Sequence, residues 1–256
     1  MCLIAIAWQA HPAFPLVIAA NRDEWRNRAT QAAHCWPEQP NQPKLLAGRD
    51  MQAGGTWMGI TKNGRFAAVT NFRDPSELRS NARSRGALVT DFLLGEAAPE
   101  VFLSQLAADV ELYSGFNLIA GDRTRLFYLG SHAPEVHAIA PGVHALSNHM
   151  LDVPWPKVLR ARAAMDGAMS DHDPAPRLFT MLSDASFAPD NELPDTGVGL
   201  ELERRLSAPL IVGPSYGSRA STVLTVAQGG GVTFEERTRT PDGSVSETHT
   251  FSFLLD

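Results

Sequence analysis

Residues 1–8 read MCLIAIAW and residues 16–24 read LVIAANRDE. Each stretch contains an apolar run without polar alternation, which is typical of strands that are covered on both faces. Two prolines between the runs indicate a turn. We therefore predict that residues 3–8 and 16–20 form adjacent central strands, and that the second strand ends in a polar cluster beside the start of the chain.

The composition is that of an ordinary globular protein, with 44% hydrophobic and 20% charged residues among 256. A net charge of -6 gives the whole molecule no attraction to nucleic acid or to anionic lipid. Residues 1–8 lack the basic flank and cleavage site of a signal peptide and are too short to cross a bilayer. Two cysteines cannot form a disulfide framework. We expect a cytoplasmic protein without a membrane span.

The remaining pattern groups strands with strands and helices with helices. Residues 56–61 and 65–71 flank Asn63-Gly64, which is a strong hairpin signal. Residues 26–44, which are polar and proline-rich, are predicted to be a surface loop. Further expected strands are 116–120, 126–129, 136–140, 143–146, 221–227, 231–239 and 244–255, and expected helices are 84–94, 101–110, 158–169, 177–182 and 200–206. No repeat or linker divides the chain, so we predict one α+β domain over residues 1–256 with largely antiparallel sheets.

Cys2 is the first candidate for chemistry. Removal of Met1 would leave its α-amino group free, with a pKa of about 7.7–8.0, so that one residue could supply both a nucleophile and a base. A free cysteine is also among the most buried residue types, so Cys2 could instead be a small hydrophobic residue that begins a strand.

Three further polar residues could act with Cys2. Arg22 near the thiol would favour the thiolate, and Asp23 could orient the α-amino group or hold Arg22. Asn71, at the end of a predicted strand, could donate to a developing oxyanion. The alternatives are a solvated strand end with a surface ion pair for the first two, and an ordinary strand-to-turn asparagine for the third.

Other segments carry weaker signals. Residues 215–222, SYGSRAST, precede a predicted strand, and Arg219 among glycine and hydroxyl residues could capture an anion or lie in a loop without a ligand. The histidines have no metal-ligand spacing, so we expect no metal site. No phosphate-binding loop or nucleophile elbow is present.

Taken together, an ordered series of segments along nearly the whole chain resembles the NRDE family, the Transport and Golgi organization protein 2 homologues. The segments that carry the resemblance are Met1-Cys2, Ala20-Asn21-Arg22-Asp23-Glu24, Gly54-Gly55-Thr56-Trp57-Met58-Gly59, Thr70-Asn71-Phe72-Arg73, Asn117-Leu118, Leu146-Ser147-Asn148, Pro154-Trp155-Pro156-Lys157-Val158 and Gly217-Ser218-Arg219-Ala220-Ser221-Thr222.

That family in turn resembles the cysteine N-terminal-nucleophile (Ntn) hydrolases of the choloylglycine hydrolase and penicillin V acylase type. Those enzymes share the Met-Cys start and a hairpin of the form G-x4-G-x6-N, which Gly59, Gly64 and Asn71 reproduce. The resemblance implies a four-layer αββα sandwich. It also implies that Cys2, Arg22, Asp23 and Asn71 are catalytic and that Asn21, Trp57, Asn148 and Arg219 contact the substrate.

Two classes of function follow from the resemblance. The first is a cysteine amidohydrolase that cleaves a linear, non-peptide C–N bond in a small or lipid-like substrate through a thioester acyl-enzyme, without a cofactor. The second is a protein that binds or carries haem or an acyl lipid on the same fold, since members of the family are linked to haem trafficking and lipid homeostasis. Covalent haem attachment is excluded because no C-x-x-C-H motif exists.

Overall fold

The computed structural model describes residues 3–37, 40, 42–77 and 81–256. Its strands are β1 (Leu3–Trp8), β2 (Leu16–Trp25), β3 (Thr30–Cys35), β4 (Leu45–Asp50), β5 (Met58–Thr61), β6 (Phe66–Asn71), β7 (Phe116–Gly121), β8 (Leu126–Gly130), β9 (Ala133–Ala138), β10 (Gly142–Leu146), β11 (Tyr216–Val226), β12 (Gly231–Arg239) and β13 (Val245–Leu254). Its α-helices are α1 (Arg85–Leu94), α2 (Pro99–Ala107), α3 (Pro156–Ala168), α4 (Ala175–Leu182) and α5 (Leu200–Leu206). Helices α2 and α3 begin at proline, whose fixed φ and missing N–H suit a first helical turn.

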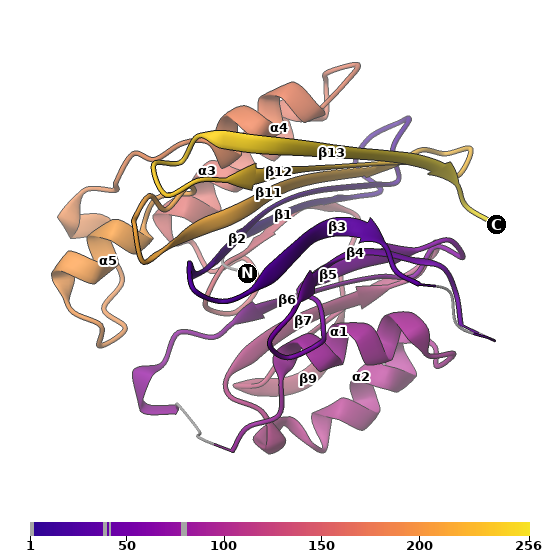
Figure 1. Ribbon diagram of the computed structural model, residues 1–256, viewed down its shortest axis with the longest axis horizontal. Helices are drawn as coiled ribbons and strands as arrows, with labels where there is room; N and C mark the ends of the chain where they lie inside the picture. Colours follow the sequence, from indigo (N-terminus) through magenta and orange to yellow (C-terminus); the bar gives the residue numbers. More distant parts are fainter. Residues whose placement is uncertain (1–2, 38–39, 41, 78–80) are drawn as a thin grey trace.

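One sheet has six strands in the order β10-β1-β2-β11-β12-β13, all antiparallel (Figure 1). β1 pairs with β2 from Leu3 opposite Asn21 to Trp8 opposite Leu16. The prediction that these two strands are adjacent and central is therefore confirmed.

The second sheet has seven antiparallel strands in the order β3-β4-β5-β6-β7-β8-β9. β5 and β6 form the predicted hairpin. Gly64 in its turn has φ +85°, a left-handed conformation that glycine adopts at little cost. The main-chain N–H of Gly64 donates to the Thr61 carbonyl at 2.9 Å, which closes the turn.

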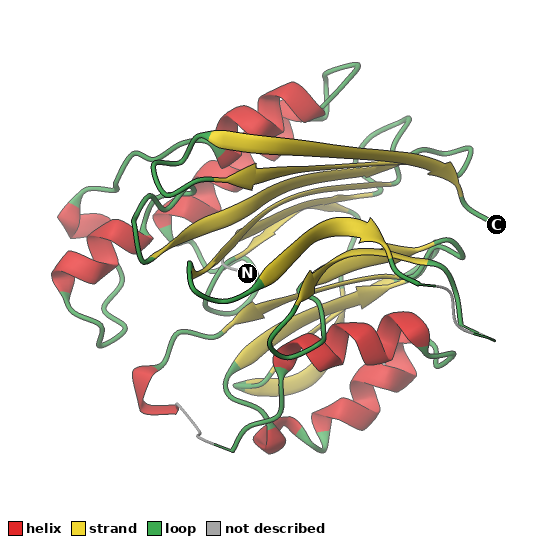
Figure 2. Ribbon diagram, in the orientation of Figure 1, coloured by secondary structure: helices red, strands yellow, loops and turns green. Residues whose placement is uncertain are grey.

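The two sheets face each other, and a helical layer covers each outer face (Figure 2). Residues alternate along β1, as strand geometry requires. Ile4, Ile6 and Trp8 belong to the core between the sheets, whereas Leu3 and its alternate neighbours pack with α3 and α4. α1 and α2 cover the seven-stranded sheet through a third apolar core. Both faces of β1 are thus buried, which explains its unbroken apolar run and confirms the expected αββα arrangement.

Two predicted loops are wrong in part. The polar stretch 26–44 contains β3, the edge strand of the seven-stranded sheet, in which Ala33 is the buried residue. An edge strand with one side exposed needs no apolar alternation, so its composition resembles a loop. The segment 215–222 is also not a loop, because β11 begins at Tyr216 and runs through it with an irregular register at Arg219.

No helix in the described part of the chain is long and apolar enough to cross a membrane.

Candidate active site

The polar end of β2 divides its residues between the two faces of the six-stranded sheet. Asn21 is fully buried, and its side-chain amide donates to the main-chain carbonyls of Leu182 and Pro209 at 2.9 and 2.8 Å. Its side-chain oxygen accepts a hydrogen bond from Ser221 at 2.6 Å. Arg22, the next residue, lies over the ring of Trp57, which directly precedes β5 of the opposite sheet. Successive side chains of a strand point to opposite faces, so Asn21 anchors the helical side while Arg22 lies between the sheets.

A cavity of about 660 Å³ opens at this end of the sandwich. Four of the residues predicted for the site line it, namely Arg22, Asp23, Trp57 and Asn71. Cys2 lies outside the described residues. Leu3, the first described residue, pairs with Asn21, so the described chain begins beside this polar cluster.

Arg22 is held rigidly although it is charged. Only 4% of the residue is exposed, and its guanidinium centre lies 4.3 Å from the centroid of the Trp57 ring. Nη1 donates to the Thr30 hydroxyl at 3.1 Å, and Nη2 lies 3.7 Å from a carboxylate oxygen of Glu24. Burial lowers the pKa of Arg22, against the opposing effect of the carboxylates of Glu24 and Asp50. Arg22 is therefore a fixed cation that is almost entirely shielded from solvent.

Asp23 is fixed by the neighbouring strand β11. Its carboxylate accepts a 2.5 Å hydrogen bond from the hydroxyl of Ser218, the residue opposite it in the sheet. The Ser218 oxygen in turn accepts the main-chain N–H of Ile211 at 2.9 Å. Both Asp23 and Ser218 are buried. These contacts fix the side chain of Asp23, a residue that lines the cavity.

Asn71 ends β6 at the facing wall. Its main-chain carbonyl accepts a 3.1 Å hydrogen bond from the side-chain amide of Asn148. Within the described residues, the Asn71 side chain itself makes no hydrogen bond, and it is half-buried. Asn148 is not among the cavity-lining residues, and its own side-chain oxygen lies 3.3 Å from Arg73 Nη2. Asn148 thus positions the backbone of Asn71.

Arg219 is directed toward the turn between β2 and β3. Its Nη1 donates to the carbonyls of Trp25 and Arg28 at 2.9 and 3.0 Å. Among the four residues predicted to contact substrate, Trp57 lines the cavity, while Asn21, Asn148 and Arg219 make the structural contacts described above.

The sequence did not point to several residues that line the cavity. Arg28 and Asp50 form an ion pair at 2.7 Å. Burial acts to raise the pKa of Asp50, but the Arg28 hydrogen bond and two main-chain N–H groups hold it below its ordinary value. Residues 83–86, at the start of α1, and Tyr216 complete the wall. The ARSRG pattern of residues 82–86 contains no motif that could have identified it.

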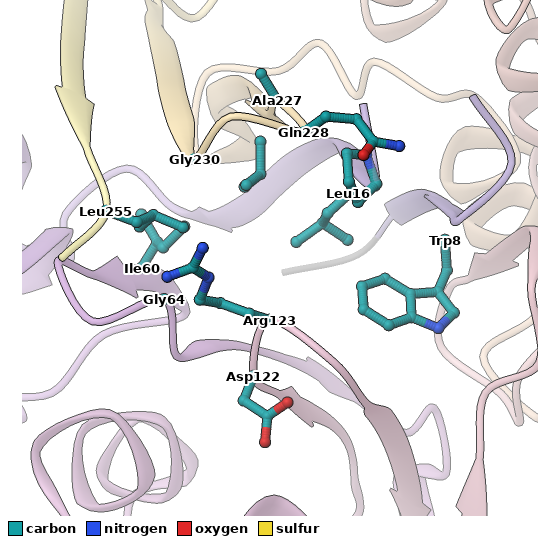
Figure 3. Close-up of a pocket in the computed structure, with 12 residues that line it drawn as sticks. Trp8, Leu16, Ile60, Gly64, Asp122, Arg123, Ala227, Gln228, Gly230 and Leu255 are labelled. Atoms are coloured by element: carbon teal, nitrogen blue, oxygen red, sulfur yellow. The ribbon is translucent and has the colours of Figure 1, made fainter. Parts of the chain in front are cut away.

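A second, smaller cavity of about 110 Å³ lies at the other end of β1 and β2, where Trp8 and Leu16 line it (Figure 3). None of the predicted site residues within the described part of the chain lines it. No group of three or more His, Cys, Asp or Glu side chains in the described ranges is arranged to hold a metal ion.

Comparisons with known proteins cover nearly the whole chain. A sequence profile of the family described as "Transport and Golgi organisation 2" matches residues 1–241. The Transport and Golgi organization 2 homolog of Mus musculus is 34% identical over 278 residues, covering 100% of this chain and 99% of the mouse protein. Transport and Golgi organization protein 2 of Drosophila melanogaster is 27% identical and covers 97% of each chain.

Solved structures similar in shape include a conjugated bile acid hydrolase from Clostridium perfringens, with 11% identity and a TM-score of 0.45 over 99% of this chain and 97% of that one. An N-acylethanolamine-hydrolyzing acid amidase ortholog from Caenorhabditis elegans has 12% identity and a TM-score of 0.49 over 87% of this chain and 92% of that one. The assignment rests on the sequence matches: this chain belongs to the Transport and Golgi organisation 2 family.

Proposed function

We propose that the protein is a cysteine amidohydrolase that cleaves a linear, non-peptide amide with Cys2 as the nucleophile. The observation that carries the proposal is that Arg22, Asp23 and Asn71 line one cavity, at the end of the sheet where the described chain begins. Cys2 is joined to Leu3 by a single peptide bond. The resemblance to cysteine Ntn hydrolases gives the same four residues catalytic roles.

The reaction begins after removal of Met1. The Cys2 thiol passes its proton to the free α-amino group, and the sulfur attacks the carbonyl carbon of the substrate. The oxyanion that forms accepts a hydrogen bond from the Asn71 side-chain amide. The tetrahedral intermediate collapses to a thioester as the C–N bond breaks, and the leaving amine takes the proton from the α-ammonium group. Water then attacks the thioester, with the α-amino group as base, and releases the acid and the thiol.

Arg22 and Asp23 prepare the nucleophile in this mechanism. A guanidinium near a thiol lowers the thiol pKa because it stabilises the thiolate. Arg22 suits this role because Trp57 and Thr30 hold it within the protein rather than in solvent. The carboxylate of Asp23 would stabilise the α-ammonium form, and its hydrogen bond from Ser218 fixes its orientation.

Alkylation by iodoacetamide tests the nucleophile. At pH 7 we expect Cys2 to react roughly tenfold faster than Cys35, an exposed thiol, because its thiolate fraction is larger. Arg22→Ala should slow Cys2 alone, whereas Arg125→Ala, at the exposed surface, should change neither rate. Intact mass shows whether Met1 has been removed, and protein that retains Met1 should react more slowly. Equal rates at both thiols, unchanged by Arg22→Ala, would leave non-catalytic binding of haem or an acyl ligand as the function.

A second measurement tests the oxyanion role of Asn71. Acylation of Cys2 by a p-nitrophenyl ester passes through a tetrahedral oxyanion, whereas alkylation by iodoacetamide does not. We expect Asn71→Ala to slow acylation by about 10²–10³-fold and to leave alkylation unchanged. Equal losses in both reactions would assign Asn71 a structural role instead.

A further inference from the structure

The charges that line the large cavity are unequal. Four arginines and three acidic residues face it, namely Arg22, Arg28, Arg83, Arg85, Asp23, Glu24 and Asp50. Glu24 lies within ion-pair distance of Arg22 and Arg28, at 3.7 and 3.8 Å, and Asp50 pairs with Arg28 at 2.7 Å. Glu24 and Asp50 therefore lie beside the two arginines on the β2 side, and Arg83 and Arg85 bring further positive charge to the start of α1.

Arg83 presents that charge at the edge of the cavity. Its main-chain N–H donates to the Leu112 carbonyl at 2.9 Å, and it forms an isolated bridge with Tyr113, so its backbone is fixed. The residue is exposed, and across the described ranges its side chain forms no ion pair. A guanidinium that faces a cavity without a carboxylate opposite it is suited to bind an anion.

Arg85 lies close to the residue proposed as the oxyanion donor. Its Nη1 donates to the Gly115 carbonyl at 3.1 Å. The same carbonyl accepts the main-chain N–H of Phe72, the residue after Asn71, at 2.9 Å. The Gly115 carbonyl therefore links Arg85 to the end of β6. An anionic group of the substrate bound by Arg85 would lie near the substrate amide that is cleaved.

The ends of β2 and β11 give the cavity an aromatic wall. Trp25 and Tyr216 both line the cavity, with ring centroids 5.3 Å apart in an edge-to-face arrangement. Trp25 is 57% exposed, so its ring surface is accessible to a molecule in the cavity. This wall can pack against the apolar part of a substrate while the opposite wall holds its charge.

We infer that the substrate is a linear amide that carries an anionic group a few bonds from the cleaved C–N bond, and that Arg83 and Arg85 bind this group. The inference rests on the proposed function for the identity of the reacting thiol, but the charge pattern of the cavity is independent of it. A carboxylate, phosphonate or sulfonate has the required chemistry. A neutral substrate would leave the two arginines without a role in recognition.

Matched alkylating reagents test the inference through Cys2. N-iodoacetyl-β-alanine is anionic, and N-iodoacetyl-β-alaninamide is its neutral counterpart. We expect the anionic reagent to react with Cys2 about tenfold faster than the neutral one, since a hydrogen bond to a charged group is worth that much, and to show no such preference at Cys35. The double variant Arg83→Gln/Arg85→Gln should abolish the preference. Arg125→Gln, on the exposed surface, should preserve it.

A binding measurement separates the two proposals. In a Cys2→Ser variant, N-acetyl-β-alanine should bind more tightly than N-acetyl-β-alaninamide in an NMR titration, and the double arginine variant should remove the difference. If Cys2 and Cys35 react alike but this difference persists, the proposed nucleophile is wrong and the anion site stands. If the anionic and neutral ligands bind equally, or if the arginine changes have no effect, the inference is overturned even where Cys2 is reactive.

Discussion

Among single residues, Glu236 is the buried carboxylate that joins the two sheets. It lies on β12 with 1% of its surface exposed, and its Oε1 accepts the main-chain N–H of Ala33 on β3 at 2.7 Å. Ala33 falls where the β3–β4 register is interrupted, so its N–H is free to reach across. Burial raises the pKa of Glu236, although the Ala33 N–H, the Thr222 hydroxyl and the charges of His249 and Arg22 act to lower it.

This shift predicts a dependence of stability on pH. The pKa in the folded protein lies above the ordinary value of 4.5. Between these two pKa values, the folded state therefore binds more protons than the unfolded state. The free energy of unfolding therefore decreases as the pH rises from about 4.5 through the folded pKa. Glu236→Gln keeps an oxygen for Ala33 and removes the titration. We expect it to gain stability relative to the wild type between pH 4 and 8 in urea unfolding.

The matched control is Glu235→Gln. Glu235 neighbours Glu236 on β12 but is partly exposed and paired with Arg237 at 2.8 Å. For Glu235→Gln, we expect no comparable gain in the free energy of unfolding relative to the wild type. A constant difference between Glu236→Gln and wild type at every pH would show that the carboxyl titrates normally.

Among the secondary-structure elements, β4 supports the site from behind. Gly48 is buried on this strand, and a Cβ added there would lie 2.3 Å from the Trp57 ring. Trp57 therefore packs directly on the β4 backbone, and the guanidinium of Arg22 lies over its ring. Because Gly48 has no side chain, the Trp57 ring can lie against β4, and the position of this ring determines where the Arg22 guanidinium lies.

Gly48→Ala should displace Trp57, because the contact is with a rigid ring close to the backbone. We expect the free energy of unfolding to decrease by about 1–3 kcal/mol, with a change in tryptophan fluorescence and slower alkylation of Cys2. Gly229→Ala is the control, since a Cβ there meets no atom within 4 Å. Normal stability and alkylation in Gly48→Ala would contradict the packing argument.

Across the whole molecule, one buried ion pair connects the end of the seven-stranded sheet to α5. Arg73, just after β6, donates from Nη1 to Glu203 at 2.7 Å, and Glu203 is 3% exposed. The other carboxylate oxygen of Glu203 accepts the main-chain N–H of Thr196 at 2.8 Å. Arg73 also lies over the Trp155 ring and contacts Asn148, which holds Asn71. The pair therefore links the candidate site to α5, the helix at the left of Figure 1.

Arg73→Met should leave the carboxylate of Glu203 buried without its cation, at a cost of about 3–5 kcal/mol in the free energy of unfolding. Replacing both residues, as Arg73→Met/Glu203→Leu, should recover much of that loss because no isolated charge remains. Urea unfolding of the two single variants and the double variant measures the coupling. Glu201→Gln, on the same helix but exposed, should change stability by at most about 1 kcal/mol. Additive losses in the double variant would show that the pair is not coupled.

The sequence by itself determined the elements that rely on local or periodic signals. The apolar runs of β1 and β2 predicted strands buried on both faces, and Asn63-Gly64 predicted the β5–β6 hairpin, because turn and periodicity preferences act over a few residues. β3 escaped prediction because an edge strand needs no apolar pattern.

The tertiary structure alone decided which polar residues share the cavity. Asp23 is fixed by Ser218, which lies 195 residues away in the chain. Asn21 and Arg22 are adjacent in sequence, yet strand alternation sends one toward the helices and the other between the sheets. Arg85 and the main chain just after Asn71 meet at the carbonyl of Gly115. Such contacts depend on strand register and sheet packing, which are set by long-range pairing and are not encoded in any local stretch.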